Sequence, residues 1–109
     1  FYFCMNQITV EELKTLLENK PQNIIVVDVR TKEERDAGYI EGTIHIPLDQ
    51  IPFQIAEIGK SEKVYFQCAK GGRSASACDI LLTADFPDAY NVMGGIEEWK
   101  RKGYSISHL

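Results

Sequence analysis

A run of β-branched side chains from Ile24 to Val29, interrupted only by Asp28, constrains the fold more than any other feature of this sequence. The run does not alternate between apolar and polar residues, so it predicts a strand that is buried on both faces. Strands of that kind occur in parallel sheets whose two faces are covered by helices. The sequence therefore favours an α/β fold.

Two predicted helices begin at capping boxes, in which a threonine hydroxyl and a glutamate three residues later satisfy the first free amides of the helix. The boxes are Thr9–Glu12 and Thr31–Glu34. Apolar side chains at helical spacing follow the first box, and these are Leu13, Leu16 and Leu17. We expect the second helix to end at Gly38 in a left-handed cap.

Further segments alternate between strand and helix. A strand is predicted at residues 63–67, and shorter strands at 43–46 and 89–92. One helix is predicted after residues 63–67, and its inward residues are Ala75, Cys78, Leu81 and Leu82. Another is predicted after Gly94–Gly95, with Ile96 and Trp99 facing inward. This alternation predicts a three-layer α/β sandwich with a mainly parallel sheet. At 109 residues we expect one domain, residues 8–109, preceded by an N-terminal stub or linker of residues 1–7.

Composition excludes several classes of function. Twelve Lys and Arg against sixteen Asp and Glu give a net charge of −4 with no basic stripe, so nucleic acid is not an expected partner. The longest apolar runs are Phe1–Met5 and Ile24–Val27, far shorter than the ~20 residues that cross a membrane. They are also shorter than the core of a signal peptide. We therefore expect a cytoplasmic protein with no membrane partner.

The cysteines indicate neither a disulfide framework nor a metal site. Cys4, Cys68 and Cys78 are an odd and sparse set, and we expect them to be free thiols. With only His45 and His108 besides them, the ligands for zinc are too few. The helical spacing of Cys78 indicates a role in core packing, whereas Cys4 is either exposed or marks a contact with a missing segment.

The segment Cys68–Arg73 has the composition of an anion-binding loop. It lies between the 63–67 strand and the helix expected from Ser74, where ligands of open α/β sheets bind. Gly71 and Gly72 let successive N–H groups turn inward, and the helix N-terminus adds free amides. Lys70 and Arg73 add two positive charges at the rim.

A thiol held in such a loop should ionise more readily than a free cysteine, because amides and cations stabilise its thiolate. We therefore predict that Cys68 is a nucleophile; the alternative is an inert buried cysteine beside a glycine turn. The spacing is Cys-x4-Arg, one residue shorter than the Cys-x5-Arg of cysteine-dependent phosphatases. The shorter ring suits a sulfur atom or a persulfide better than a tetrahedral phosphate.

At these residues the sequence resembles the rhodanese family of sulfurtransferases, in its small single-domain, thiosulfate sulfurtransferase-like form. The loop Cys68–Ser74 matches the six-residue catalytic loop of that family. Two further signatures flank it, and the likeness runs from about Ile8 to Tyr104. The first signature includes Val27–Arg30, Glu34, Gly38–Ile40, Gly42 and Ile44–Pro47; the second includes Asn91–Ile96, Glu98–Trp99 and Gly103–Tyr104.

The resemblance implies a five-stranded, mainly parallel sheet flanked by helices, and a ping-pong transfer of sulfane sulfur through a Cys68 persulfide. A small anionic donor such as thiosulfate and a thiol or cyanide acceptor are the implied partners, and no cofactor is needed. The implied substrate-binding residues are those of the loop, namely Ala69, Lys70, Gly71, Gly72, Arg73 and Ser74. Many family members place an arginine directly after the cysteine, where this chain has Ala69. We expect Lys70 to supply that charge.

Asp28 and Arg30 lie at the end of the buried strand, near the edge where the loop is expected. They are interpreted either as partners that brace the loop from behind or as a structural ion pair, and the second interpretation is favoured. Two functions besides sulfur transfer remain open. One is a non-catalytic binding or regulatory module of a larger protein, and the other is a phosphatase or arsenate reductase.

Overall fold

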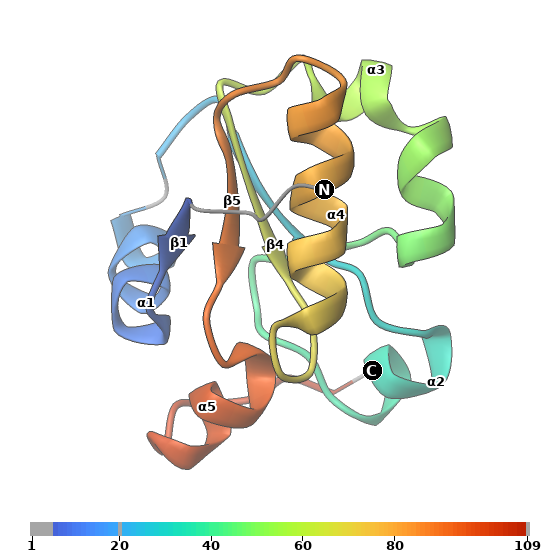
Figure 1. Ribbon diagram of the computed structural model, residues 1–109. Coiled ribbons are helices and arrows are strands. Elements are labelled where there is room, and N and C mark those ends of the chain that lie inside the picture. The colour runs from blue at the N-terminus through green and yellow to red at the C-terminus, as the bar shows by residue number, and fades with distance from the viewer. Residues whose placement is uncertain (1–5, 20, 109) are drawn as a thin grey trace.

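Five parallel strands form the centre of the structure, a computed structural model that describes residues 6–19 and 21–108 (Figure 1). Their order across the sheet is β1-β5-β4-β2-β3, and all four neighbouring pairs are parallel. The strands are β1 (Gln7–Ile8), β2 (Ile24–Asp28), β3 (Ile44–His45), β4 (Lys63–Gln67) and β5 (Ala89–Val92). The prediction of a mainly parallel five-stranded sheet is confirmed.

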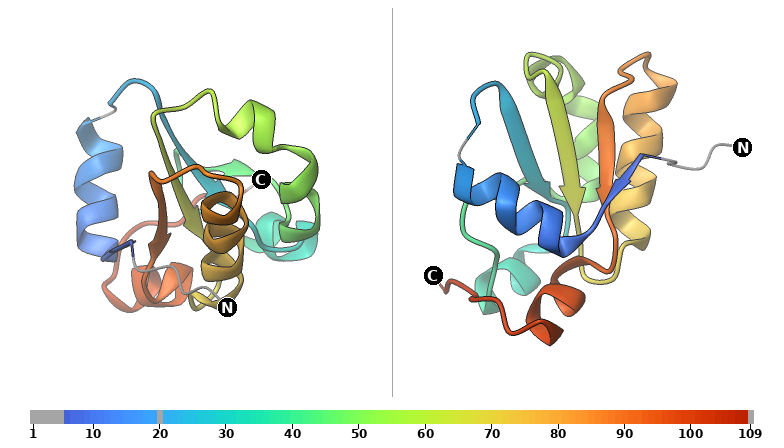
Figure 2. Two further views of the ribbon diagram at one scale, coloured as in Figure 1. Left: turned by 45° about the horizontal axis from the view of Figure 1, so that its top comes forward. Right: turned by 90° about the vertical axis from the view of Figure 1, so that its left-hand side faces the viewer.

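Helices cover both faces of the sheet, which makes three layers (Figure 2). On one face lie α1 (Val10–Asn19) and α5 (Gly95–Arg101), and on the other lie the 3₁₀ helix η1 (Leu48–Phe53), α3 (Ile55–Ile58) and α4 (Gly72–Thr83). The short α2 (Lys32–Ala37) lies, like α5, at the end of the sheet toward which the strands point (Figure 1). This end is the one where the β4–α4 loop turns.

The two faces of β4 show why its residues form a central strand. Val64 and Phe66 pack into one core with α4, η1 and α3, whereas Tyr65 packs into the other with α1 and α5. Consecutive side chains of a strand point to opposite faces, so a strand covered on both sides is apolar at every position. The same reasoning holds for Val26 and Val27 of β2, which are 3% and 0% exposed. Both cores therefore meet at the strands that carry the candidate site.

Most predicted elements are confirmed. The 63–67 and 89–92 strands have the predicted bounds, and the 43–46 strand is reduced to Ile44–His45. Both capping boxes form: the backbone N–H of Glu12 donates to Thr9 Oγ1 over 3.1 Å, and Thr31 and Glu34 make the same exchange before α2. The sequence did not predict β1, η1 or α3. Strand β1 starts at Gln7, within the segment that we expected to be a stub.

Two local expectations are wrong. Gly38 ends α2 at φ 153° and ψ 144°, not in a left-handed cap, because the chain continues extended to pair Tyr39 with Ser107. Cys78 packs in the core as expected, at 0% exposure, but it is disulfide-bonded instead of a free thiol. Cys4, for which we left two roles open, lies outside the described residues.

Candidate active site

The loop between β4 and α4 is Cys68–Gly71, and it closes tightly around the Cys68 side chain. Strand β4 ends at Gln67, and α4 begins at Gly72 with Gly71 as its N-cap in the left-handed conformation, at φ 113°. That conformation is accessible to glycine at little cost because it has no Cβ. The turn at Gly71 reverses the chain, so the first amides of α4 point back toward Cys68.

Cys68 Sγ accepts two backbone hydrogen bonds in this turn. The N–H of Gly71 donates over 3.1 Å and that of Ser74 over 3.3 Å, while Ser74 Oγ lies 3.3 Å from Sγ. The cysteine is 1% exposed. Burial raises the pKa of its thiol, but the contact with the Ser74 hydroxyl and the hydrogen bonds from the amides of Ser74, Gly71 and Lys70 outweigh burial, and the pKa is lowered overall. The site therefore favours a thiolate at neutral pH more than water does.

The carbonyl groups of the loop point away from Sγ, into the N-terminus of α5. Ile96 N–H donates to the Cys68 carbonyl over 2.9 Å, and Glu97 N–H donates to the Ala69 carbonyl over 3.0 Å. The buried Gln67 side chain donates a second hydrogen bond to the Cys68 carbonyl through Nε2. With these carbonyls held outside the ring, the amides that follow them face inward.

Gly95 makes this contact possible. It has a φ of 57°, and a Cβ at this position would overlap the Cys68 carbonyl oxygen and lie 2.6 Å from the Ala69 carbonyl oxygen. A side chain at residue 95 would therefore push α5 off the loop. The sequence singled out Gly94–Gly95 without a role, and the structure assigns it the close approach of two backbones.

Arg73 is bound to α2. Its two terminal nitrogens donate to both carboxylate oxygens of Glu34, over 2.7 and 2.9 Å. The Arg73 guanidinium, assisted by the Thr31 backbone N–H and hydroxyl against the opposing effect of burial, lowers the pKa of Glu34 to about 2. The charge that we expected Arg73 to present at the rim is thus compensated by Glu34.

Lys70 is the other cation of the loop. Its side chain is exposed and takes part in none of the ion pairs among residues 6–19 and 21–108. Of the two rim charges expected from the sequence, Lys70 is therefore the one available to an anion arriving from solution.

Asp28 and Arg30 form a buried ion pair behind the loop. Arg30 Nη2 donates to Asp28 over 2.8 Å and to the Gly38 carbonyl over 2.7 Å, and Arg35 adds a second, 3.3 Å ion pair to Asp28. Within the described chain, neither side chain hydrogen-bonds to a residue of the loop. This arrangement favours the structural ion pair over direct bracing.

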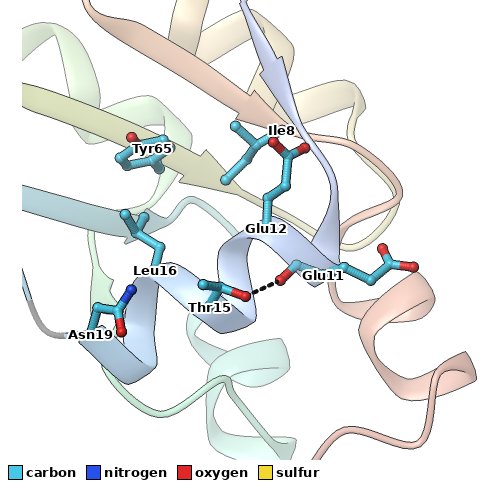
Figure 3. A pocket seen from close by; sticks show the side chains of 7 residues that line it. All are labelled: Ile8, Glu11, Glu12, Thr15, Leu16, Asn19 and Tyr65. Atoms are coloured by element: carbon cyan, nitrogen blue, oxygen red, sulfur yellow. Dashed lines mark hydrogen bonds between the residues drawn. The ribbon is translucent and has the colours of Figure 1, made fainter.

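Two shallow cavities adjoin the loop and the first turn of α4. One, of about 220 Å³, has Ala69 and Ile96 in its wall together with Arg30 and Lys100. The other, of about 410 Å³, is bordered by Arg73, Pro47 and Leu48. A third cavity, of about 470 Å³, lies along α1 and is lined by residues such as Glu12, Leu16 and Tyr65 (Figure 3). It contains no residue of the loop.

The remaining candidates lie outside the site. His45 Nε2 lies 2.8 Å from the Arg30 carbonyl, and Trp99 is a core residue whose indole N–H donates to the Ser105 carbonyl. The described residues contain no cluster of His, Cys, Asp or Glu that could hold a metal ion. Nor does the described part of the chain contain a helix long and apolar enough to cross a membrane.

Sequence reasoning missed Asn91 as a neighbour of the site. Its side-chain oxygen accepts a 2.5 Å hydrogen bond from Ser74 Oγ, and the residue is 5% exposed. The available signal was a polar residue near the end of a strand that is otherwise apolar. Glu34 was likewise named in a signature without a partner, because its separation of 39 positions from Arg73 hides the pairing.

The fold and loop define a cysteine-centred α/β domain, and comparison with known proteins identifies its family. The model of the rhodanese-like domain matches residues 9–102, and the chain belongs to this family. A sulfurtransferase of Allochromatium vinosum is 33% identical over 102 residues, covering 94% of each chain. The mouse thiosulfate sulfurtransferase/rhodanese-like domain-containing protein 3 is 36% identical, over 89% of this chain and 71% of that protein.

A solved structure supports the same assignment. The crystal structure of a rhodanese-like domain protein from Staphylococcus aureus matches with a TM-score of 0.80 and 39% identity, covering 96% of this chain and 99% of that one. Together the relatives support a rhodanese-type enzyme and sulfur transfer as the general activity.

Proposed function

We propose that this protein is a sulfurtransferase that carries sulfane sulfur as a persulfide on Cys68. The observation that carries the proposal is the environment of the buried Cys68 Sγ. This atom accepts hydrogen bonds from the N–H groups of Gly71 and Ser74, and the pKa of the thiol is lowered. A thiolate in such a ring is a competent nucleophile. The sulfurtransferase relatives support the same class of reaction.

In the first half-reaction the Cys68 thiolate attacks the outer sulfur of a donor such as thiosulfate. A bond forms between Sγ and that sulfur, the sulfur–sulfur bond of the donor breaks, and its electron pair leaves with sulfite. The charge of −3 on thiolate and thiosulfate becomes −1 on the persulfide and −2 on sulfite, so no oxidant is required. Lys70, exposed and without an ion-pair partner among the described residues, attracts the dianion.

In the second half-reaction an acceptor nucleophile, a thiolate or cyanide, attacks the outer sulfur of the persulfide. The bond between the two sulfurs breaks, and its electron pair returns to Sγ as the Cys68 thiolate. The inward N–H groups of Gly71 and Ser74 stabilise the negative charge in both halves of the cycle, in the manner of an oxyanion hole. Splitting the transfer in two leaves each step a simple displacement at sulfur.

The test is the intact mass of the protein after incubation with thiosulfate, before and after reduction, for the native chain and for Cys68→Ser. We expect a gain of about 32 Da, one sulfur, in the native chain alone, and its loss on reduction. Cys68→Ser retains the loop because the change is nearly isosteric. An equal gain in the variant would overturn the assignment of Cys68. No gain with thiosulfate or with a persulfide donor would favour a non-catalytic binding module, and turnover of a phosphate ester would favour a phosphatase.

A further inference from the structure

The side chain of Asn91 lies against both residues whose amides bind Cys68 Sγ. In the sheet, Asn91 of β5 is in register with Phe66 of β4, two residues before Cys68, so all three side chains emerge on the same face. The Oδ1 end of its amide meets Ser74 Oγ, and a Cβ added to Gly71 would lie 3.9 Å from the Nδ2 end. Asn91 therefore contacts the ring from the neighbouring strand.

Three side chains form a continuous line of polar contacts. Cys68 Sγ lies 3.3 Å from Ser74 Oγ, and Ser74 Oγ lies 2.5 Å from Asn91 Oδ1. All three residues are buried, with exposures of 1%, 0% and 5% respectively. Water does not readily replace a partner in such a place, so each donor must match an acceptor within the line.

A serine hydroxyl has one proton, and this limits the states of the line. When Ser74 donates to Asn91 Oδ1, it can only accept from Cys68, which must then be a thiol with its S–H directed at Oγ. When Cys68 is a thiolate, Ser74 must donate to Sγ. Its lone pair then faces Asn91, and an amide oxygen at 2.5 Å would leave two acceptors in contact. The Asn91 oxygen and the Cys68 thiolate therefore compete for the one hydroxyl proton of Ser74.

We propose that Asn91 is a positioning residue, whose side-chain oxygen competes with the Cys68 thiolate for the single proton of the Ser74 hydroxyl. The inference rests on the proposed function only in taking the Cys68 thiolate as the working form of the site. Asn91 itself touches neither substrate nor the reacting sulfur. It acts through Ser74.

The charged groups around Sγ do not interfere with this arrangement. They are Lys70 and Arg73 near the loop, Glu34 of α2, which is paired with Arg73, and Asp28 of β2, whose charge is felt at Arg73. None of the four donates to or accepts from Ser74 Oγ or the Asn91 amide among the described hydrogen bonds. Substitutions at residue 91 therefore change the donors and acceptors of the line while leaving these charges in place.

The test measures the rate at which iodoacetamide alkylates Cys68 as a function of pH, for the native chain, Asn91→Leu and Asn91→Asp. The reducing conditions are mild enough to leave the disulfide of Cys78 intact. Leucine removes the competing acceptor, so the Ser74 proton is free for Sγ and the midpoint of the profile moves to lower pH. Aspartate, ionised, offers only acceptors and retains the proton, so the midpoint moves to higher pH. A hydrogen bond to a charged group gives about a tenfold change in rate below the midpoint in each case.

The Ser74→Ala background separates this role from a packing role. Without the hydroxyl, we expect Asn91→Leu to leave the alkylation midpoint unchanged, and Asn91→Asp to keep only the part of its shift that is due to charge. Ser76→Ala, an exposed serine of α4 whose hydroxyl contacts the Gly72 carbonyl, is the control for Ser74→Ala and should leave the profile unchanged. Circular dichroism and thermal unfolding identify any variant that fails to fold.

Two results of the alkylation experiment would contradict the proposal. If Asn91→Leu and Asn91→Asp shift the midpoint in the same direction, or if the Leu shift persists in Ser74→Ala, Asn91 only packs against the loop and the proposal is wrong. Alkylation reports on the thiol and not on sulfur transfer. The two proposals can therefore fail separately. If the native chain takes no sulfur from thiosulfate, but Asn91→Leu lowers and Asn91→Asp raises the alkylation midpoint, the proposed function is wrong and this inference stands.

Discussion

Glu34 and Arg73 form a two-pronged ion pair, at 2.7 and 2.9 Å, that joins the first turn of α2 to the first turn of α4 across the mouth of the candidate site. Glu34 also completes the capping box of α2 by accepting from the Thr31 backbone N–H over 3.0 Å. One carboxylate thus fixes the start of a helix and one side of the Cys68 loop. Loss of the Glu34 carboxylate would therefore affect both the start of α2 and the Cys68 loop.

We expect Glu34→Gln to reduce the free energy of unfolding by about 1 kcal/mol near neutral pH, since both partners are roughly one-third exposed and solvent weakens the pair. The pKa of Glu34, about 2, lies below its ordinary 4.5, so the contribution is complete above the ordinary value and is lost as pH falls toward 2. Chemical unfolding of both proteins at several pH values measures the difference. Glu33→Gln, an exposed neighbour with no ion pair among the described residues, is the control, and a gap that did not narrow in acid would contradict the prediction.

Gly95→Ala should separate α5 from the loop. The added methyl group would meet the Ala69 carbonyl at 2.6 Å in a backbone conformation that favours glycine, and we expect a loss of about 2–4 kcal/mol in stability together with slower alkylation of Cys68. Gly103→Ala is a matched control, because Gly103 also has a positive φ, of 79°, but has open space where its Cβ would lie. It should cost about 1 kcal/mol and leave Cys68 unchanged. Equal effects of the two substitutions on alkylation would exclude a specific role for Gly95.

Lys70 and Arg73 should affect thiosulfate use in different ways. We expect Lys70→Gln to raise KM for thiosulfate about fivefold, as loss of one exposed charge contact would, with unfolding unchanged and with a smaller effect at high salt. Arg73→Ala should reduce both activity and thermal stability, because it also releases Glu34. Lys60→Gln, at the opposite end of β4, is the charge-matched control in steady-state kinetics. A Lys70 variant with native KM at low salt would show that the donor does not use this charge.

Asp28→Asn tests the buried ion pair. The carboxylate is fully buried and serves both Arg30 and Arg35, so its neutralisation leaves two guanidinium groups with a weaker partner. We expect a loss of about 3 kcal/mol in denaturant unfolding. Asp36→Asn, which breaks the exposed pair with Lys32, should cost less than about 1 kcal/mol. Similar costs for the two variants would mean that the buried pair contributes no more to stability than an exposed one.

Local sequence signals predicted much of this fold because their physics is local. The capping hydroxyls of Thr9 and Thr31, and the apolar runs of β2 and β4, act within a few residues or through simple burial. The same holds for the Cys68–Arg73 loop, whose glycines and cations are adjacent in the chain. Its placement after a buried strand followed from the alternation of strands and helices.

Interactions across the chain were beyond these signals. Strand order, the Glu34–Arg73 pair and the contact of Asn91 with Ser74 join residues that are 17 to 84 positions apart, and no local pattern encodes their distance. The segment after Pro47 was missed for a different reason. Its 3₁₀ helix contains Pro52 and buries only Ile51, so it lacks the apolar repeat that marks a longer helix.

The loop carbonyls of Cys68 and Ala69 are held by amides of Ile96 and Glu97, which are made nearly thirty residues later. During synthesis, Cys68 is therefore made 28 residues, or about a few seconds, before the first backbone amide that orders its surroundings. A nascent chain that ends before Gly95 carries the Cys68 thiol but lacks the Ile96 and Glu97 amides that hold the loop carbonyls away from it. Ordering of this thiol's surroundings thus coincides with completion of the domain, so that an unfinished chain lacks the environment that favours its thiolate.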